Sequence, residues 1–131
     1  MSQLFSDAWM SRLKEEWNKT PSVYEPLQKA DFSSRIGYGF KGEPAPRGML
    51  HIVNGKVVYA GKPESEELDW DLRATPESWA LWIEKGFGLT KLGPAVATNT
   101  LEFAKGNYRQ MITNPLLGVP FLQHFELMRK V

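Results

Sequence analysis

The sequence contains few residues of the types that usually form catalytic or binding sites. The first candidate for such a site is the glycine motif GYGFKG at residues 37–42. Its spacing matches G-x-G-x-x-G, in which a strand leads into a helix whose N-terminus holds a pyrophosphate. Here the glycines fall within a predicted strand, and Pro44 and Pro46 stand where the helix would begin. We therefore expect glycines on the exposed face of a twisted or bulged strand and no nucleotide site.

Two histidines, His51 and His124, are the next candidates for a metal or proton-transfer site. Neither has a carboxylate at the spacing of a helical zinc site, and no G-x-S-x-G motif supplies a nucleophile. His124 lies at the edge of an apolar stripe with Phe121 and Met128. It is either a hydrogen-bonded boundary residue or a polar anchor for a ligand head group, whereas His51 is expected on a sheet face.

Asp69 and Asp71 lie on the same face of a predicted strand, as an acid–base pair or a cation site would require. Leu68 and Leu72 alternate with them and are expected to point inward, and Arg73 follows on the polar face. A solvated, cross-paired row of charges is therefore predicted. With these candidates set aside, we expect no catalytic residues, no metal and no cofactor, in a protein that is not an enzyme.

The size and charge of the chain limit what it can do. Its 131 residues predict one domain over residues 1–131. Its 16 basic and 15 acidic side chains give a net charge of +1, which predicts no nucleic-acid partner. It contains no cysteine, so disulfides and thiol chemistry are excluded. The N-terminus does not resemble a signal peptide, and no apolar run reaches the ~18 residues of a membrane helix. We expect a cytoplasmic protein without stable membrane insertion.

The local patterns predict two helices followed by a sheet. Apolar residues recur every four positions from Phe5 to Trp17, as in an amphipathic helix capped near Ser6, and residues 20–31 predict a second helix, shortened or kinked by Pro26. The Asn-Gly pair at residues 54–55 predicts a type I′ hairpin. Further strands are predicted over residues 32–40, 68–73 and 100–106. Because each strand has one apolar face, helices should cover one side of the sheet, which is an α+β arrangement.

The C-terminal half is unusually apolar. A helix capped by Thr75 places Trp79, Trp82 and Ile83 on one face. The segment NPLLGVPF, residues 114–121, is predicted to be a loop because of its two prolines and its glycine, yet most of its side chains are apolar. An apolar loop must pack against the core, a partner or a bound hydrophobic molecule. A helix is predicted to end the chain.

Three stretches carry a resemblance to a known family: MLHIVNGKVVYAG (49–61), LDWDLRATPESWALWIEKG (68–86) and GLTKLGPAVATNTLEFAKGNYRQMI (88–112). They contain an Asn-Gly hairpin, a strand that runs into a capped helix, and a strand that ends in Lys-Gly before another helix. In this order and local texture, the chain from residue 33 to its end resembles the sterol carrier protein 2 family of lipid-transfer domains.

The resemblance implies a five-stranded, mostly antiparallel or mixed sheet, covered on one face by helices, with an internal hydrophobic cavity between the two layers. It also implies non-catalytic binding and transfer of a fatty acid, a fatty acyl-CoA, a sterol-like molecule or another lipid. Such a cavity should have a volume of roughly several hundred Å³. Because an empty apolar cavity costs stability, it should either hold a guest or collapse.

On that fold, apolar residues of the C-terminal half would surround the ligand. The predicted ligand-binding residues are Trp79, Trp82, Ile83, Phe87, Leu89, Met111, Ile112, Leu116, Leu117, Val119, Phe121, His124 and Phe125. The alternative function is an accessory subunit that shelters or delivers a hydrophobic or quinone-like intermediate to a partner enzyme. A homodimer is left open. An enzyme would need one of the two histidines in the pocket beside a carboxylate.

Overall fold

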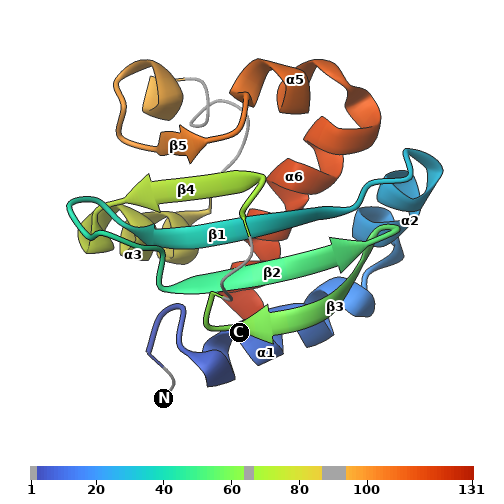
Figure 1. The fold of residues 1–131 in the computed structure, drawn as a ribbon, viewed down its shortest axis with the longest axis horizontal. Helices are drawn as coiled ribbons and strands as arrows, with labels where there is room; N and C mark the ends of the chain where they lie inside the picture. The colour runs from blue at the N-terminus through green and yellow to red at the C-terminus, as the bar shows by residue number, and fades with distance from the viewer. Residues whose placement is uncertain (1–2, 64–66, 87–93) are drawn as a thin grey trace.

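The computed structural model describes residues 3–63, 67–86 and 94–131, apart from the side chains at positions 108, 112 and 115. The helices are α1 (Asp7–Asn18), α2 (Pro21–Lys29), α3 (Pro76–Lys85), α5 (Tyr108–Thr113) and α6 (Pro115–Leu127), with a 3-10 turn η1 (Met128–Lys130) after α6. Residues 94–97 form a further helical turn. The strands are β1 (Ser34–Phe40), β2 (Gly48–Val53), β3 (Lys56–Gly61), β4 (Trp70–Ala74) and β5 (Glu102–Lys105). The predicted element order is confirmed (Figure 1).

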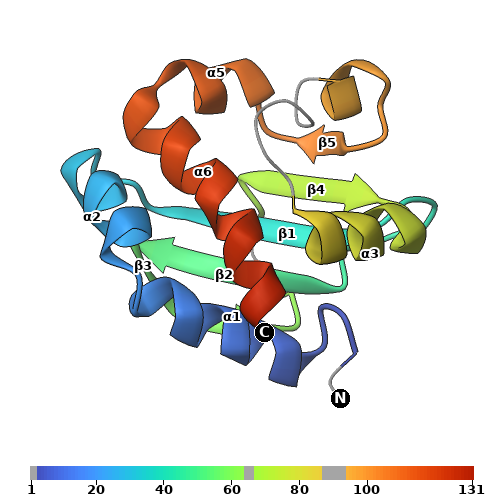
Figure 2. The same cartoon turned by 180° about the vertical axis from the view of Figure 1, so that it is seen from behind.

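The strands form one mixed, five-stranded sheet in the order β3-β2-β1-β4-β5. β1 and β4 are parallel, and the other neighbouring pairs are antiparallel. Helices α1, α2, α3 and α6 lie behind the sheet in Figure 1 and in front of it in Figure 2, so they cover a single face. The α+β architecture expected from one-sided strands is therefore confirmed.

The hairpin between β2 and β3 forms at the predicted Asn-Gly pair. Asn54 has φ 48° and Gly55 has φ 86°, the two positive values that a type I′ turn requires. The Trp17 indole N–H donates to the carbonyl oxygen of Gly55 at 2.8 Å. The hairpin tip is thereby fastened to the end of α1.

Helix α1 also closes the free edge of β3. The Asn18 side-chain amide donates to the carbonyl oxygen of Val57 at 2.9 Å, and its oxygen accepts from the Val57 N–H at 2.9 Å. The Asn18 amide therefore makes the pair of bonds that a neighbouring strand would make. At Val57, the edge of β3 is therefore closed to pairing with a further strand.

The uncovered face of the sheet differs from the prediction. Gly37 and Gly39 are buried, not exposed, because the loop after β1 and the segment before β4 lie over them. A Cβ at Gly39 would lie 2.8 Å from Pro46 Cα, and one at Gly37 would lie 2.6 Å from Leu68 Cδ1. The glycines thus permit close approach, and Leu68 packs on this face and not in the core beneath the helices.

Arg73, expected in a solvated row of charges, is only 8% exposed. Its guanidinium donates twice to the Asp71 carboxylate, at 2.6 and 3.0 Å, so it pairs within β4 and not across strands as predicted. It also donates to the carbonyl oxygens of Glu43, at 2.9 Å, and Phe40, at 3.4 Å. The prediction of solvation is wrong because Arg73 is buried beneath the loop that follows β1 and donates hydrogen bonds to its backbone.

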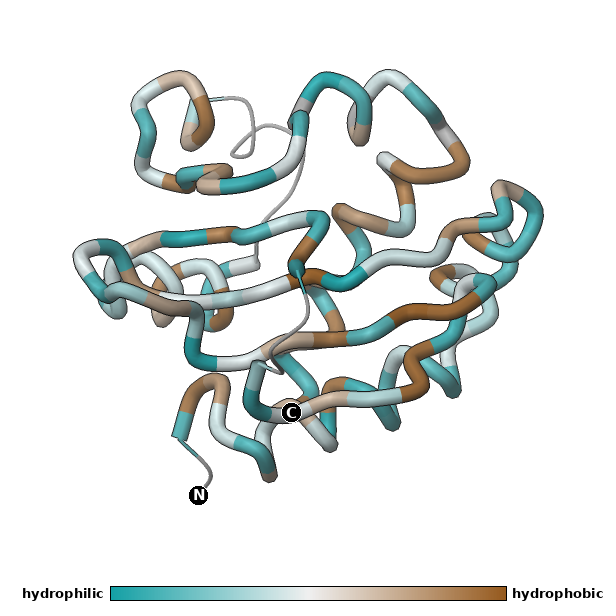
Figure 3. The backbone as a smooth tube through the Cα atoms, viewed as in Figure 1, coloured by the Kyte–Doolittle hydropathy of each residue, from teal (hydrophilic) through white to brown (hydrophobic). Residues whose placement is uncertain are grey.

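The predicted loop at residues 114–121 is also wrong, because α6 begins at Pro115. Asn114 is its N-cap, with the side-chain oxygen accepting from Leu116 N–H at 3.0 Å, and Pro115 occupies the first helical position, where proline fits. Pro120 lies inside the helix and forgoes one backbone hydrogen bond. The loss is offset by burial, since Pro120 and Phe121 are buried. Figure 3 shows that the first turns of α6 are hydrophobic in sequence.

Candidate functional site

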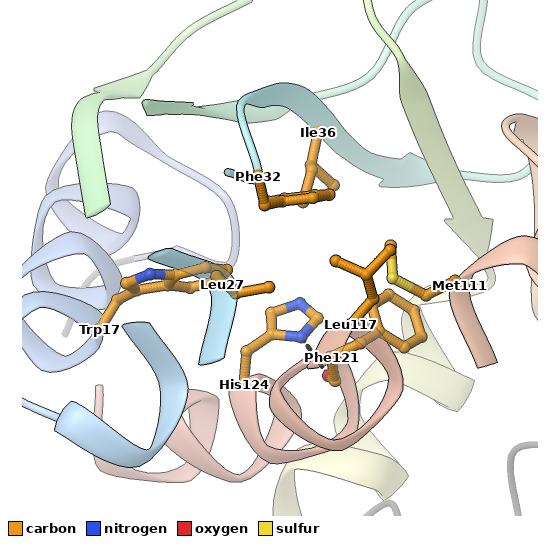
Figure 4. Close-up of a pocket in the computed structure, with 8 residues that line it drawn as sticks. All are labelled: Trp17, Leu27, Phe32, Ile36, Met111, Leu117, Phe121 and His124. Carbon is orange, nitrogen blue, oxygen red and sulfur yellow. Dashed lines mark hydrogen bonds between the residues drawn. The ribbon is translucent and has the colours of Figure 1, made fainter. Parts of the chain in front are cut away.

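A small apolar cavity lies between β1 and the helices that cover it (Figure 4). Its volume is about 10 Å³, roughly the space of one water molecule. Its lining residues are Trp17, Leu27, Phe32, Ile36, Met111, Leu117, Phe121 and His124. The cavity is far smaller than the several hundred Å³ expected of a lipid site.

The end of α2 sets one side of the cavity. Asp31 adopts φ 51°, its N–H donates to Gln28 O at 3.1 Å, and Phe32 N–H donates to Leu27 O at 2.9 Å. These are the two bonds of a Schellman motif, in which hydrophobic residues at the positions of Leu27 and Phe32 come into contact. Both residues line the cavity, so a helix-ending motif positions them there.

Helix α6 sets the opposite side. Leu117, Phe121 and His124 follow at spacings of four and three, which places them on one face of the helix. Figure 4 shows this face turned toward Phe32 and Ile36, with Met111 of α5 beside it. Leu117 and Phe32 are only partly buried, so they form the accessible rim of an otherwise closed space.

His124 is the polar member of the lining, and it is fully buried. Its Nδ1 faces the carbonyl oxygen of Phe121, which can only accept, so this nitrogen carries the proton and donates. Nε2 is then the acceptor, and the Tyr38 hydroxyl, 3.0 Å away, donates to it. The hydrogen bonds thus assign one tautomer to His124.

Burial also determines the charge of this pair. It lowers the pKa of His124 to about 4, although the hydrogen bond to the Phe121 carbonyl acts in the opposite direction. Burial raises the pKa of the Tyr38 hydroxyl well above its ordinary value. Both groups are therefore neutral at neutral pH, and the described side chains around the cavity carry no charge.

A second aromatic cluster, Phe5, Trp79 and Trp82, lies outside the cavity lining. The Trp79 indole N–H donates to the carbonyl oxygen of Gly39 at 2.9 Å. The Trp79 ring meets Phe5 and Trp82 edge-on, with centroids 5.1 and 5.5 Å apart. Trp79 and Trp82 therefore pack in the core beneath β1, and Phe125 joins them to the cavity through its contact with Phe121.

Only some of the predicted ligand-binding residues lie at the cavity. Met111, Leu117, Phe121 and His124 line the cavity, while Trp79, Trp82 and Phe125 are buried outside its lining. Ile83 borders a polar surface groove with Glu84 and Arg129, and Leu116 and Val119 are exposed. Phe87, Leu89 and the side chain of Ile112 lie outside the described residues.

Four lining residues were not predicted: Trp17, Leu27, Phe32 and Ile36. The apolar periodicity of the N-terminal half correctly indicates that Trp17 and Ile36 face the core. It does not indicate which core residues border a cavity. The sequence signal for Leu27 and Phe32 is the pair Asp31-Phe32 after α2, because this pair completes the Schellman motif that brings Phe32 into contact with Leu27.

The described residues contain no group of three or more histidine, aspartate or glutamate side chains that could hold a metal ion. His124 is hydrogen-bonded to a hydroxyl and a backbone carbonyl, not to a carboxylate. Within the same ranges, no helix is both long and apolar enough to cross a bilayer. His51 lies on β2, where it pairs with Arg35 and Tyr59 across the sheet.

Comparison with solved structures shows that the chain has the sterol carrier protein 2 fold, as the resemblance implied. A crystal structure of sterol carrier protein 2 matches with a TM-score of 0.77 and 16% identity, covering 98% of this chain and 99% of that one. A conserved hypothetical protein from Thermus thermophilus matches with a TM-score of 0.73 and 17% identity, over 98% and 89% of the two chains.

A ubiquinone synthesis protein, UbiJ-SCP2, has the same fold, with a TM-score of 0.60 and 13% identity over 98% of this chain and 93% of that one. No protein-family model and no curated protein sequence matches the chain. The likeness is therefore one of fold.

Proposed function

We propose that this protein binds a hydrophobic molecule between its sheet and its helices and carries it without altering it. The observation that supports this most strongly is the cavity between β1 and α6, whose described lining is apolar apart from one neutral histidine. The same fold occurs in sterol carrier protein 2. A ligand that binds to such a lining gains free energy mainly by burying its apolar surface.

Binding requires the cavity to open. Small-molecule sites usually have volumes of roughly 300–1,000 Å³, against about 10 Å³ here. We propose that the ligand enters past the partly buried Phe32 and Leu117 and separates α6 from β1 as it does so. Opening the cavity in this way costs free energy. Burial of each methylene group of the ligand would offset about 0.8 kcal/mol of that free energy.

A second function deserves a test because of two observations. One of the similar folds is that of a ubiquinone synthesis protein, and Leu116 and Val119 on the first turns of α6 are exposed. We propose as the alternative that the protein shelters a hydrophobic intermediate for a partner enzyme. Exposed tryptophans on α1 would have supported this alternative further, but Trp9 and Trp17 are buried.

Binding can be tested with N-phenyl-1-naphthylamine, a neutral fluorophore that brightens in apolar surroundings. We expect saturable binding of one molecule per chain. The variant Leu117→Trp places a larger side chain at the rim and should weaken binding about tenfold or more, a change of about 1.4 kcal/mol. The control Val119→Trp adds the same side chain to the same helix at a residue that is 59% exposed, and should bind normally.

Both variants must first show the circular dichroism and thermal transition of a folded protein. If Leu117→Trp does not fold, Phe32→Trp serves in its place, because Phe32 forms the other side of the rim. Binding that is absent, or that is equal in the rim variant and the control, would contradict the proposal.

A further inference from the structure

Tyr38 and His124 form a polar pair that the apolar cavity does not need for packing. Both side chains are fully buried, so neither can exchange its hydrogen bond for water in the closed state. Two apolar side chains of similar shape could fill the same volume at nearly equal stability. Figure 4 shows the His124 ring projecting from α6 toward the space below Phe32 and Ile36. Of the two, His124 lines the cavity, and Tyr38 on β1 lies behind it at hydrogen-bond distance.

The donors and acceptors of this pair are fixed. His124 Nδ1–H is used by the Phe121 carbonyl oxygen, which leaves Nε2 as an acceptor that takes the Tyr38 hydroxyl proton at 3.0 Å. A ligand group inserted between the two side chains must therefore accept from Tyr38 and donate to His124. An alcohol does both. An ether or a carbonyl can only accept, and would leave Nε2 without a partner.

A carboxylate fits less well still. It cannot donate, and no described side chain that lines the cavity carries a positive charge to pair with it. Burying an unpaired charge costs far more than burying a hydroxyl that keeps its hydrogen bonds. The same argument applies to a phosphate or sulfate group.

From this geometry we infer that Tyr38 and His124 determine specificity, and that the site prefers a hydrophobic molecule with an uncharged hydroxyl group over one that ends in a carboxylate. The hydroxyl inserts between Tyr38 Oη and His124 Nε2 and relays the hydrogen bond that joins them in the closed state. This inference rests on the proposed function, since it concerns the ligand of the same cavity.

The test compares three compounds with the same chain: 1-dodecanol, dodecanoate and dodecyl methyl ether. Each displaces N-phenyl-1-naphthylamine in a titration at about pH 8, where a carboxyl group is ionised. We expect 1-dodecanol to bind about tenfold or more tightly than either of the others. The ether separates loss of the donor from the presence of charge.

The matched variant is the double substitution Tyr38→Phe and His124→Leu, which removes both partners and leaves neither polar group unsatisfied. It should no longer bind the alcohol more tightly than the ether, because the buried hydroxyl has lost its partners. A second readout is the ¹⁵N resonance of His124 Nε2, which should shift little when the hydroxyl of 1-dodecanol replaces that of Tyr38, and more if the ether inserts and leaves Nε2 without a donor.

The outcomes separate the two proposals. Equal affinity of the wild-type protein for 1-dodecanol and dodecanoate, or an alcohol preference that survives in the double variant, would overturn the inference while leaving the carrier function intact. Failure of every compound, including the fluorophore, to bind would overturn both.

Discussion

At the scale of single residues, the Tyr38–His124 pair joins the sheet to the last helix inside the apolar layer. Tyr38 comes from β1 and His124 from α6, and their hydrogen bond is buried. A buried polar group is costly unless its partner is in place. The pair therefore stabilises the closed arrangement only while His124 stays neutral, which makes this part of the stability sensitive to pH.

We expect the free energy of unfolding to fall as the pH is lowered through the range from about 6.5 to about 4. Burial lowers the pKa of His124 from 6.5 to about 4 in the folded protein, so in this range the unfolded chain binds a proton that the folded protein does not. The contribution of His124 is complete above about pH 6.5 and is lost toward pH 4. At one pKa unit per ~1.4 kcal/mol, the loss approaches about 3 kcal/mol.

Urea denaturation of the wild-type protein and of His124→Gln measures this contribution. Glutamine does not titrate, so the difference in unfolding free energy between the two proteins should change across this pH range. His51→Gln is the control for the loss of an imidazole elsewhere, because His51 lies on β2 outside the cavity lining. A His124→Gln difference that does not vary with pH would show that His124 is not held neutral.

At the scale of elements, the contact between α1 and β3 positions one wall of the cavity. Asn18 and Trp17 are adjacent at the end of α1, and both bond to the backbone of the β2–β3 hairpin. Because Trp17 also lines the cavity, the register of α1 along β3 determines where that wall lies.

Asn18→Ala should lower the free energy of unfolding by about 1–3 kcal/mol, because it leaves the partly buried N–H and C=O of Val57 without their partner. Ser11→Ala, at an exposed position of the same helix, is the control and should change stability by less than about 0.5 kcal/mol. Thermal or urea unfolding measures both. Equal stability of the two variants would show that the Asn18 bonds do not hold α1 in place.

The elements also show where sequence patterns suffice and where they do not. Asn54-Gly55 predicted its hairpin because a type I′ turn requires two positive φ angles in a row, a purely local property. The loop predicted at residues 114–121 is wrong because proline does not always end a helix. Pro115 instead begins the helix, and the burial of Phe121 and its neighbours outweighs the one hydrogen bond lost at Pro120. That balance depends on tertiary packing, which local sequence does not contain.

At the scale of the whole molecule, the layered fold follows from one-sided strands and amphipathic helices, so it could be predicted. The composition of the cavity wall could be predicted only in part. Phe121 and Trp79 have the same apolar character in the sequence, yet one lines the cavity and the other hydrogen-bonds beneath β1. Which large side chains border a void depends on how they interlock across the two layers, and that is a property of the packed core.

Methyl NMR can show whether a hydrophobic ligand opens the cavity between β1 and α6, as we propose. The protein, labelled at isoleucine, leucine and valine methyl groups, is titrated with 1-dodecanol. We expect shifts at Leu27, Ile36 and Leu117, which line the cavity, together with ligand-to-methyl nuclear Overhauser effects at the same residues. The exposed Val58 and Leu81 should not shift. Shifts confined to exposed methyl groups, or the absence of any shift at saturating ligand, would show that the ligand does not enter this cavity.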